Sequence, residues 1–261
     1  QLQSTLTSEV GESNYDIGHL FNYDGNNGNA GCIGCVCVDG QKGSGFSSHQ
    51  FTDNDGGPYM DDFFDIDYVP HEIGHQMGGN HTFSMRSENT GVNYEPGSGT
   101  TIMGYAGITG ADDVQDHSDP YFHYGTINQV LNNLDTRTCW TSTEITNNPP
   151  VADAGDDYTI PQGTAFKLVG SATDSDEEDV LTYTWEQVDS GTTTSSNFGP
   201  TKTSGAVWRS RPPSTNPTRY MPVKSRVLSG ELTETNPGVT FDNTSWETVS
   251  TIARSLDFAL T

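Results

Sequence analysis

The run from His71 to His81, which reads HEIGHQMGGNH, constrains this chain more than any other feature. On a helix, His71 and His75 lie one turn apart on the same face, so both imidazoles can reach one ion. Gly78 is placed to end the helix, because glycine enters the left-handed conformation without a Cβ clash. The chain can then turn and bring His81 round as a third ligand. Three protein ligands leave the fourth position of a tetrahedral zinc open, which predicts a catalytic metal site.

Glu72 lies beside the first histidine of this run. Its carboxylate can take a proton from a zinc-bound water, as the general base of a hydrolytic reaction requires. The alternative for the histidines is an ordinary helix surface, and the added Gly78 and His81 weaken that alternative. The sequence therefore predicts Zn²⁺ as cofactor and Glu72 as general base.

The extended pattern H-E-x-x-H-x-x-G-x-x-H resembles that of the metzincin metallopeptidases. In that family a tight turn containing methionine, the Met-turn, follows the zinc helix and lies beneath the metal. Residues 101–105 read TIMGY, and Met103 is the candidate for this turn. The neighbouring glycines favour a turn, whereas a core methionine that fills a gap is the alternative.

Tyr105 is a second residue that the resemblance singles out. In astacin-like metzincins, a tyrosine two residues after the Met-turn methionine can bind zinc or stabilise the tetrahedral intermediate, and the spacing here is the same. Such a donor would act on the developing oxyanion charge. A turn tyrosine packed on the core is the alternative. The remaining histidines lack ligand spacing and are expected to be structural or on the surface: His19, His49, His117 and His123.

Two further segments bear on the subgroup. Residues 16–45 resemble the strand-loop-strand of adamalysin/reprolysin-type metzincins and their bacterial relatives. Thr82 and Phe83, which follow the third histidine, resemble the residues that pappalysins have there, so the pappalysins are a competing subgroup. Adamalysins resemble one another in having an aspartate at the position of Thr82. The resemblance implies that the second strand borders the cleft and pairs with an extended protein or peptide substrate. Backbone pairing at a sheet edge gives affinity with little sequence preference.

The elements expected around the zinc helix are few. Residues 15–21 read as the first strand, 24–31 as a Gly/Asn-rich loop and 33–38 as the second strand. Residues 84–101 contain too much glycine, serine and asparagine for regular structure. A last helix is expected to begin at Thr126, which has capping-box spacing to Gln129. Its apolar stripe is expected to face the core: Ile127, Val130, Leu131 and Leu134.

The start of the chain departs from the metzincin pattern. Only 70 residues precede His71, fewer than metzincin domains usually have. We therefore expect the first strand and first helix of the upper subdomain to be absent or to exist as another fragment. Gln1 is an unlikely natural start, and metzincins are made as latent precursors, so a cleaved leader and N-terminal propeptide are expected. A non-catalytic zinc-containing binding or adhesion protein is the competing class.

Charge and cysteine usage restrict compartment and partners. A net charge of −24 argues against nucleic acid and anionic membranes, and no apolar run has the length of a membrane span. Low lysine content with abundant small polar residues is typical of secreted proteins. At least one disulfide is expected to tie residues 32–37 to Cys139, with buried free thiols as the alternative. The four cysteines allow three connectivities of two disulfides: Cys32, Cys35, Cys37 and Cys139.

The chain divides at residues 147–150, which read NNPP, because two prolines break a helix and stiffen a linker. Residues 1–146 are expected to form an α+β metzincin domain, and 151–261 an all-β module. Strands are expected at residues 165–169, 181–185 and 255–261. The runs PVADAG and LTYTW resemble PKD or other immunoglobulin-like modules of secreted bacterial enzymes. Trp185 would then be the buried strand-C aromatic of a sandwich whose final strand the chain does not reach.

An acidic run in the second part is a candidate calcium site. Residues 174–179 place five carboxylates in six positions, among them Asp174, Asp176 and Asp179. Calcium takes several oxygen ligands and tolerates irregular geometry, so Ca²⁺ binding and a solvated acidic turn are both compatible with this run. The acids between Asp53 and Asp55 and those in residues 61–67 form a weaker candidate.

Overall fold

In a computed structural model, the chain is described over residues 1–51, 61–239 and 244–261. Two units can be distinguished by their internal contacts. The first consists of Gln1–Asn80 and Thr126–Ser142, and the second of His81–Gly125 and Thr143–Thr261. These units do not follow the proline-rich linker, and the division into residues 1–146, 147–150 and 151–261 stays a prediction from sequence.

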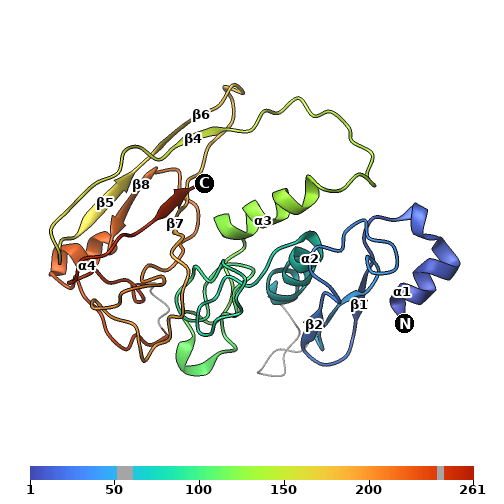
Figure 1. The fold of residues 1–261 in the computed structure, drawn as a ribbon, viewed down its shortest axis with the longest axis horizontal. Helices are drawn as coiled ribbons and strands as arrows, with labels where there is room; N and C mark the ends of the chain where they lie inside the picture. The colour runs from blue at the N-terminus through green and yellow to red at the C-terminus, as the bar shows by residue number, and fades with distance from the viewer. Residues whose placement is uncertain (52–60, 240–243) are drawn as a thin grey trace. The chain divides into compact units, whose positions relative to one another are not determined.

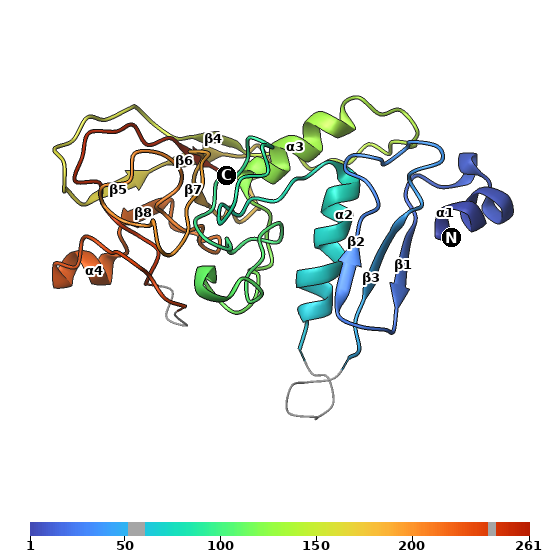
Figure 2. The same cartoon turned by 60° about the horizontal axis from the view of Figure 1, so that its bottom comes forward.

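The described residues of the first unit form a three-stranded sheet. It lies beside the helix that carries His71 and His75 (Figures 1 and 2). Strands β1 (His19–Asn22) and β3 (Gly45–Ser48) run parallel, and β2 (Asn27–Asn29) pairs antiparallel with the other side of β3. Helix α2 (Val69–Met77) packs against β2 and β3. The central strand β3 is therefore the most buried of the three, and β2 forms an edge near the motif.

The strand expected at residues 33–38 is not formed, and this part of the sequence reading is wrong. Gly34 and Cys37 have φ angles of 71° and 67°, in the left-handed region that a strand does not contain. A disulfide joins Cys32 to Cys35 with a Cα–Cα distance of 5.9 Å, whereas an extended chain would separate these atoms by about 10 Å. The segment therefore turns, and β2 forms instead within residues 24–31, which were expected to be a loop.

Short helical segments precede β1 and α2 in the chain. The chain begins with α1 (Leu2–Thr5), the π-helical η1 (Leu6–Val10) and the 3-10 helix η2 (Glu12–Asn14). The π-helical η3 (Phe64–Tyr68) leads directly into α2, whose first turn contains Pro70, a residue suited to that position because it needs no N–H donor there. Within the described residues, no helix is long and apolar enough to cross a membrane.

Helix α3 extends over Tyr124–Leu134, so it begins before Thr126, the residue expected to cap it. Thr126 lies inside the helix and is buried. The apolar stripe expected to face the core is partly wrong, since Ile127 and Leu131 are 39% and 58% exposed. Polar groups make the contacts instead. Asn133 Nδ2 donates to the carbonyl of Met77 at 2.7 Å, and Gln129 Oε1 accepts from the backbone N–H of Asn80 at 2.8 Å.

Over its described residues, the second unit contains three two-stranded antiparallel sheets (Figure 1). They pair β4 (Val151–Asp153) with β6 (Ser171–Thr173), β5 (Phe166–Val169) with β8 (Thr218–Met221), and β7 (Trp185–Gln187) with β9 (Phe258–Leu260). The 3-10 helix η4 (Gly110–Asp112) and helix α4 (Lys224–Ser229) complete its elements among the described residues. The strand expected at 165–169 is confirmed as β5, and the strand expected at 255–261 is confirmed over Phe258–Leu260 only. The strand expected at 181–185 is wrong, because only Trp185 of that range lies in a strand, β7. Pairs of this size do not show an immunoglobulin-like sandwich.

The hydrophobic core of the second unit draws on distant parts of the sequence. Trp208 and Trp246 are fully buried, and Val114 packs in the same cluster. Gly97 has a φ of 58°, and a Cβ there would lie 2.8 Å from the Trp246 ring, so the backbone approaches this tryptophan closely. The rest of the buried cluster comes from the C-terminal part: Phe198, Val207, Met221 and Val249. Residues before the linker therefore share one core with residues after it.

Backbone hydrogen bonds join the same parts of the second unit. The N–H of Gly97 donates to Thr193 O at 2.9 Å, and the N–H of Thr193 donates to Ser84 O at 2.7 Å. Trp185, the expected strand-C aromatic, is 5% exposed, and its Nε1 donates to Pro217 O at 2.9 Å. A buried indole with a satisfied N–H fits a core position, as expected for this residue.

Candidate metal centre

Helix α2 presents the first two histidines of the motif on one face. His71 and His75 are 5% and 7% exposed, and their ring centroids lie 4.9 Å apart. One nitrogen from each of His71, His75 and His81 lies within 4.8 Å of the corresponding atoms of the other two. The structure thus brings together the three residues that the spacing selects.

Gly78 ends the zinc helix in a conformation that favours glycine. Its φ is 121°, and its N–H donates to the carbonyls of Gly74 and His75. A Cβ at Gly78 would also lie 2.7 Å from the Cβ of Asn133. Glycine is therefore required both by the backbone and by the close approach of α3.

The disulfide-bonded turn satisfies the last carbonyls of the same helix. The N–H of Gly34 donates to His75 O at 2.8 Å, and the N–H of Val36 donates to Gln76 O at 3.1 Å. The final carbonyls of a helix have no partner within it, so groups from elsewhere must supply the hydrogen bonds. A second disulfide, Cys37–Cys139, ties this turn to the end of the first unit. The turn therefore supports the helix end that carries His75.

The donor set fits a zinc ion, because three imidazoles are typical zinc ligands. His75 Nδ1 lies 2.7 Å from Gly79 O, and His81 Nδ1 lies 2.7 Å from Glu88 Oε2. Each oxygen accepts a hydrogen bond from Nδ1–H, so Nε2 is the nitrogen with the lone pair in both rings. His71, His75 and His81 would hold the ion.

Glu72 lies on α2 in a confined space beside β2. Burial raises the pKa of its carboxyl to about 7, while the backbone N–H of Ala30 acts in the opposite sense. A Cβ on Gly28 would lie 2.4 Å from Glu72 Oε1, so the missing side chain leaves room for the carboxylate. A carboxyl whose pKa is near neutrality can both accept and return a proton.

Aromatic rings enclose His81. The Phe83 ring stacks on it with centroids 4.8 Å apart, and the Tyr105 ring meets it edge-on at 4.6 Å. Burial lowers the pKa of His81, and the hydrogen bond with Glu88 opposes that effect. The structure places Tyr105 beside the third histidine, and its expected action on an oxyanion stays a prediction.

The Met-turn candidate lies in a buried hydrogen-bond network. Met103 is fully buried, and its carbonyl accepts from the N–H of Thr82 at 3.1 Å. Glu95, 1% exposed, accepts from Thr82 Oγ1 and Thr101 Oγ1, each at 2.5 Å, and from the N–H of Thr100 at 2.8 Å. Glu95 therefore links the residue after the third histidine to the residues before the methionine.

Glu95 and Glu88 are not among the residues that the sequence motifs indicate. A signal for Glu95 was present, because Thr82 stands where adamalysins have an aspartate, and a buried hydroxyl there calls for an acceptor from elsewhere. Glu88 gave no comparable signal, since it lies in a stretch without periodicity.

The other candidate residues have contacts outside the group of His71, His75 and His81. His19 contacts the side chains of Gln76 and Ser47, and His123 is buried 3.8 Å from Glu186, which fits structural roles. Oxygen atoms of Asp174, Asp176 and Asp179 lie within 4.8 Å of one another. Among the described residues, the acids of 61–67 form no such group, and Asp53 to Asp55 lie outside the described residues.

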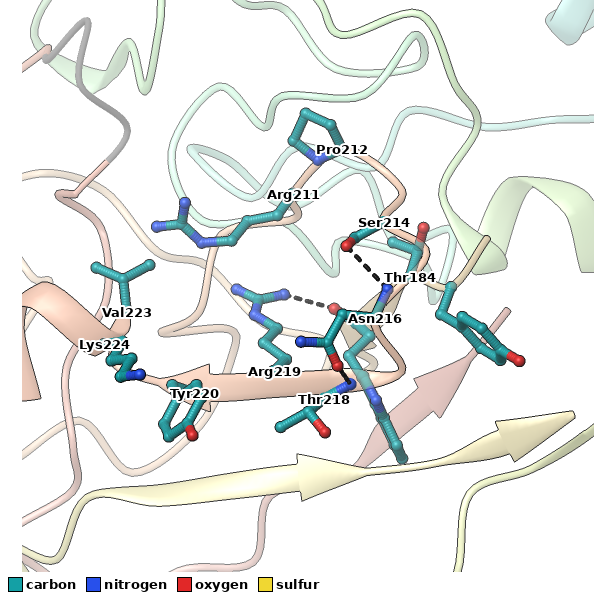
Figure 3. Close-up of a pocket in the computed structure, with 12 residues that line it drawn as sticks. Thr184, Arg211, Pro212, Ser214, Asn216, Thr218, Arg219, Tyr220, Val223 and Lys224 are labelled. Atoms are coloured by element: carbon teal, nitrogen blue, oxygen red, sulfur yellow. Dashed lines mark hydrogen bonds between the residues drawn. The ribbon is translucent and has the colours of Figure 1, made fainter. Parts of the chain in front are cut away.

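A pocket of about 210 Å³ in the second unit contains none of the predicted site residues. Arg211, Arg219 and Lys224 line it together with aromatic and small polar side chains (Figure 3). Arg219 already donates to Glu247, and also to the carbonyls of Trp185 and Arg209. Its charge is thus used within the fold.

Three histidine nitrogens grouped as for one metal ion, with Glu72 on the helix that carries His71 and His75, are the arrangement of a metal-dependent peptidase. Residues 1–134 match the model of the family described as Metallo-peptidase family M12B Reprolysin-like. The match covers half of the chain, and the protein belongs to this family of metallopeptidases, which use zinc and act on proteins or peptides. Searches of curated proteins and of solved structures gave no match.

Proposed function

We propose that the protein is a secreted zinc endopeptidase of the metzincin type, with Glu72 as general base. The observation that carries the proposal is the group of His71, His75 and His81 nitrogens within 4.8 Å, with Glu72 on α2 beside the first two of these histidines. When bound, zinc lowers the pKa of a coordinated water and polarises the scissile carbonyl. Glu72 would accept the proton of the attacking water and pass it to the leaving amine.

Strand β2 is the proposed binding edge for the substrate. Within the described sheet it pairs with β3 alone, and Gly28 lies in contact distance of Glu72. An extended peptide could add to this edge through backbone hydrogen bonds, which give affinity with little sequence preference. Asn27–Asn29 therefore takes the place that the sequence reading gave to residues 33–38.

Several finer properties belong to the same proposal. The two disulfides support an extracellular location, because such bonds persist in oxidising compartments. A bacterial source, a cleaved propeptide and an immunoglobulin-like second module follow from the resemblance alone. Calcium binding by Asp174, Asp176 and Asp179 is supported by their close oxygen atoms, and an unchanged melting temperature after calcium addition would reject it.

The substitution Glu72→Gln tests the general base. The amide is nearly isosteric but accepts no proton, so hydrolysis of a denatured protein should fall by about 10²–10⁴-fold. Zinc content should stay that of the parent, because the three histidines are intact. His75→Ala is the companion variant, and it should lose both zinc and activity.

Two outcomes contradict the proposal. Equal cleavage by Glu72→Gln and its parent would show that Glu72 is not the base. A zinc-loaded parent that cleaves nothing in a broad peptide library would instead favour the non-catalytic binding protein. Pappalysin-like and reprolysin-like enzymes share this chemistry, so the test does not depend on the subgroup.

A further inference from the structure

We propose that Glu88 is a positioning residue, which fixes the third zinc ligand by holding the Nδ1–H of His81. The inference rests on the proposed function, because it concerns the same metal centre. Glu88 Oε2 lies 2.7 Å from His81 Nδ1, and the two side chains are 25% and 15% exposed. A carboxylate at Nδ1 selects the tautomer in which Nε2 offers its lone pair to a metal, and it makes the imidazole more basic.

The ring contacts with Phe83 and Tyr105 do not determine whether Nε2 or Cε1 of His81 points toward the other two histidines. The rings of Phe83 and Tyr105 restrict the plane of the imidazole, with interplanar angles of 24° and 64°. A rotation of the imidazole by half a turn about its Cβ–Cγ bond keeps that plane, so the ring contacts distinguish the two orientations poorly. The carboxylate of Glu88 distinguishes them, because only a protonated Nδ1 can donate to it.

Glu88 is itself held in place by the loop that follows the motif. Its Oε1 accepts from Arg86 at 3.2 Å, and its N–H donates to Asn93 Oδ1 at 3.5 Å. Asn93 is 3% exposed, and its Nδ2 donates to Phe83 O at 2.7 Å. The buried asparagine therefore anchors the loop close to the residue that Glu88 contacts.

The Nδ1 partner of His81 is a side chain and that of His75 is a backbone carbonyl, so mutation can remove the first but not the second. His75 Nδ1 is paired with the backbone carbonyl of Gly79, which no side-chain substitution removes. His81 Nδ1 is paired with a charged side chain. Hydrogen bonds to ionised groups are stronger than those between neutral groups, so changing Glu88 should alter the affinity of the site itself.

The measurement is the dissociation constant for Zn²⁺, obtained by competition with a chromophoric chelator in the whole chain. Glu88→Gln removes the charge and leaves only a neutral amide acceptor for His81 Nδ1–H. Mutation of such an outer-shell partner typically weakens metal affinity by about 10–100-fold, and we expect the lower end of that range, about 10-fold, for Glu88→Gln. Glu144→Gln changes the net charge equally at an exposed position and should leave the affinity unchanged. The absorption spectrum of the Co²⁺-substituted protein should also change in Glu88→Gln and not in Glu144→Gln.

Arg86→Met separates ligand positioning from loop folding. Arg86 is 59% exposed, and the exposed ion pair with Glu88 contributes little stability. This variant keeps the contact between Glu88 and His81, so its zinc affinity should stay within about threefold of the parent's. Equal zinc affinity in Glu88→Gln and Glu144→Gln would overturn the proposal. An equal loss in Arg86→Met and Glu88→Gln would also overturn it, because the loop rather than the carboxylate would then set the affinity.

The outcome for Glu88 can be read separately from the proposed function. Zinc affinity is measured without substrate, so a protein that binds zinc but cleaves nothing would reject the peptidase proposal and leave the Glu88 result standing. Conversely, an active parent with an unaffected Glu88→Gln affinity would reject only the positioning role.

Discussion

The two units of the molecule differ in the interactions that stabilise each of them internally. The first has a three-stranded sheet with α2 packed on it, and two disulfides. The second has only two-stranded sheets among its described residues, and it buries charged side chains that bridge distant segments. Glu247, fully buried, accepts from Arg211, Arg219 and the N–H of Val223 at 2.7–2.9 Å.

This difference shows which groups satisfy the backbone hydrogen bonds when the sheets are small. Backbone groups outside regular ladders still need partners, because a buried polar group without one destabilises the fold. In the second unit carboxylates supply those partners. Glu95 accepts hydrogen bonds from the N–H groups of Thr100 and Thr101, and Glu186 accepts one from the N–H of Tyr124 at 2.6 Å. In the first unit the ladder of the three-stranded sheet supplies such partners, and N–H groups of the disulfide-bonded turn supply them to the end of α2.

The largest expected effect lies in the second unit. Glu247→Gln places an amide group among guanidinium donors and removes the negative charge beside the buried Arg219 and the partly exposed Arg211. Breaking a buried ion pair in this way costs about 3–5 kcal/mol of unfolding free energy. Urea unfolding followed by tryptophan fluorescence measures it, with the exposed Glu231→Gln as control. A loss below about 1 kcal/mol would show that the carboxylate is not what joins these segments.

A somewhat smaller effect is expected in the first unit from removing a disulfide. Cys37 and Cys139 are 102 residues apart, and replacing both by serine should cost about 2–4 kcal/mol, because the unfolded chain regains the freedom that the bond removes. Cys32 and Cys35 are only three apart, so the same double substitution there should cost less. Chemical denaturation of the two variants compares them. Equal losses would contradict the role of loop length and would reduce the contrast between the units.

The same contrast explains what the sequence could predict. His71, Glu72 and His75 lie within one helix, so spacing alone places them together. Glu95 acts on Thr82 and Thr101, which no periodicity connects, and the sequence reading did not find it. The strand expected at residues 33–38 failed because propensity favoured a strand, while the disulfide between close cysteines requires a turn.

The second unit exposes a similar limit. Strands at 165–169 and 255–261 could be read from alternation, but their partners could not. Val114 packs with Trp208 and Trp246 although the proline-rich linker separates them in sequence. A linker is recognised by local composition, whereas a shared core depends on contacts that composition does not encode.

The smallest expected effect comes from adding a single methyl group in the first unit, by the substitution Gly28→Ala. The backbone at this position tolerates alanine, but the added Cβ would lie 2.4 Å from Glu72 Oε1, so the carboxylate must move. A displacement of about 1 Å at a reacting group can lower the rate by up to about 10²-fold, and we expect Gly28→Ala to reduce kcat by about 10–100-fold. Zinc content should not change. Gly238→Ala, where a Cβ meets nothing within 4 Å, is the matched control. If both variants keep the parent's kcat, the close approach of β2 does not position Glu72, and the first unit places its base through the helix alone.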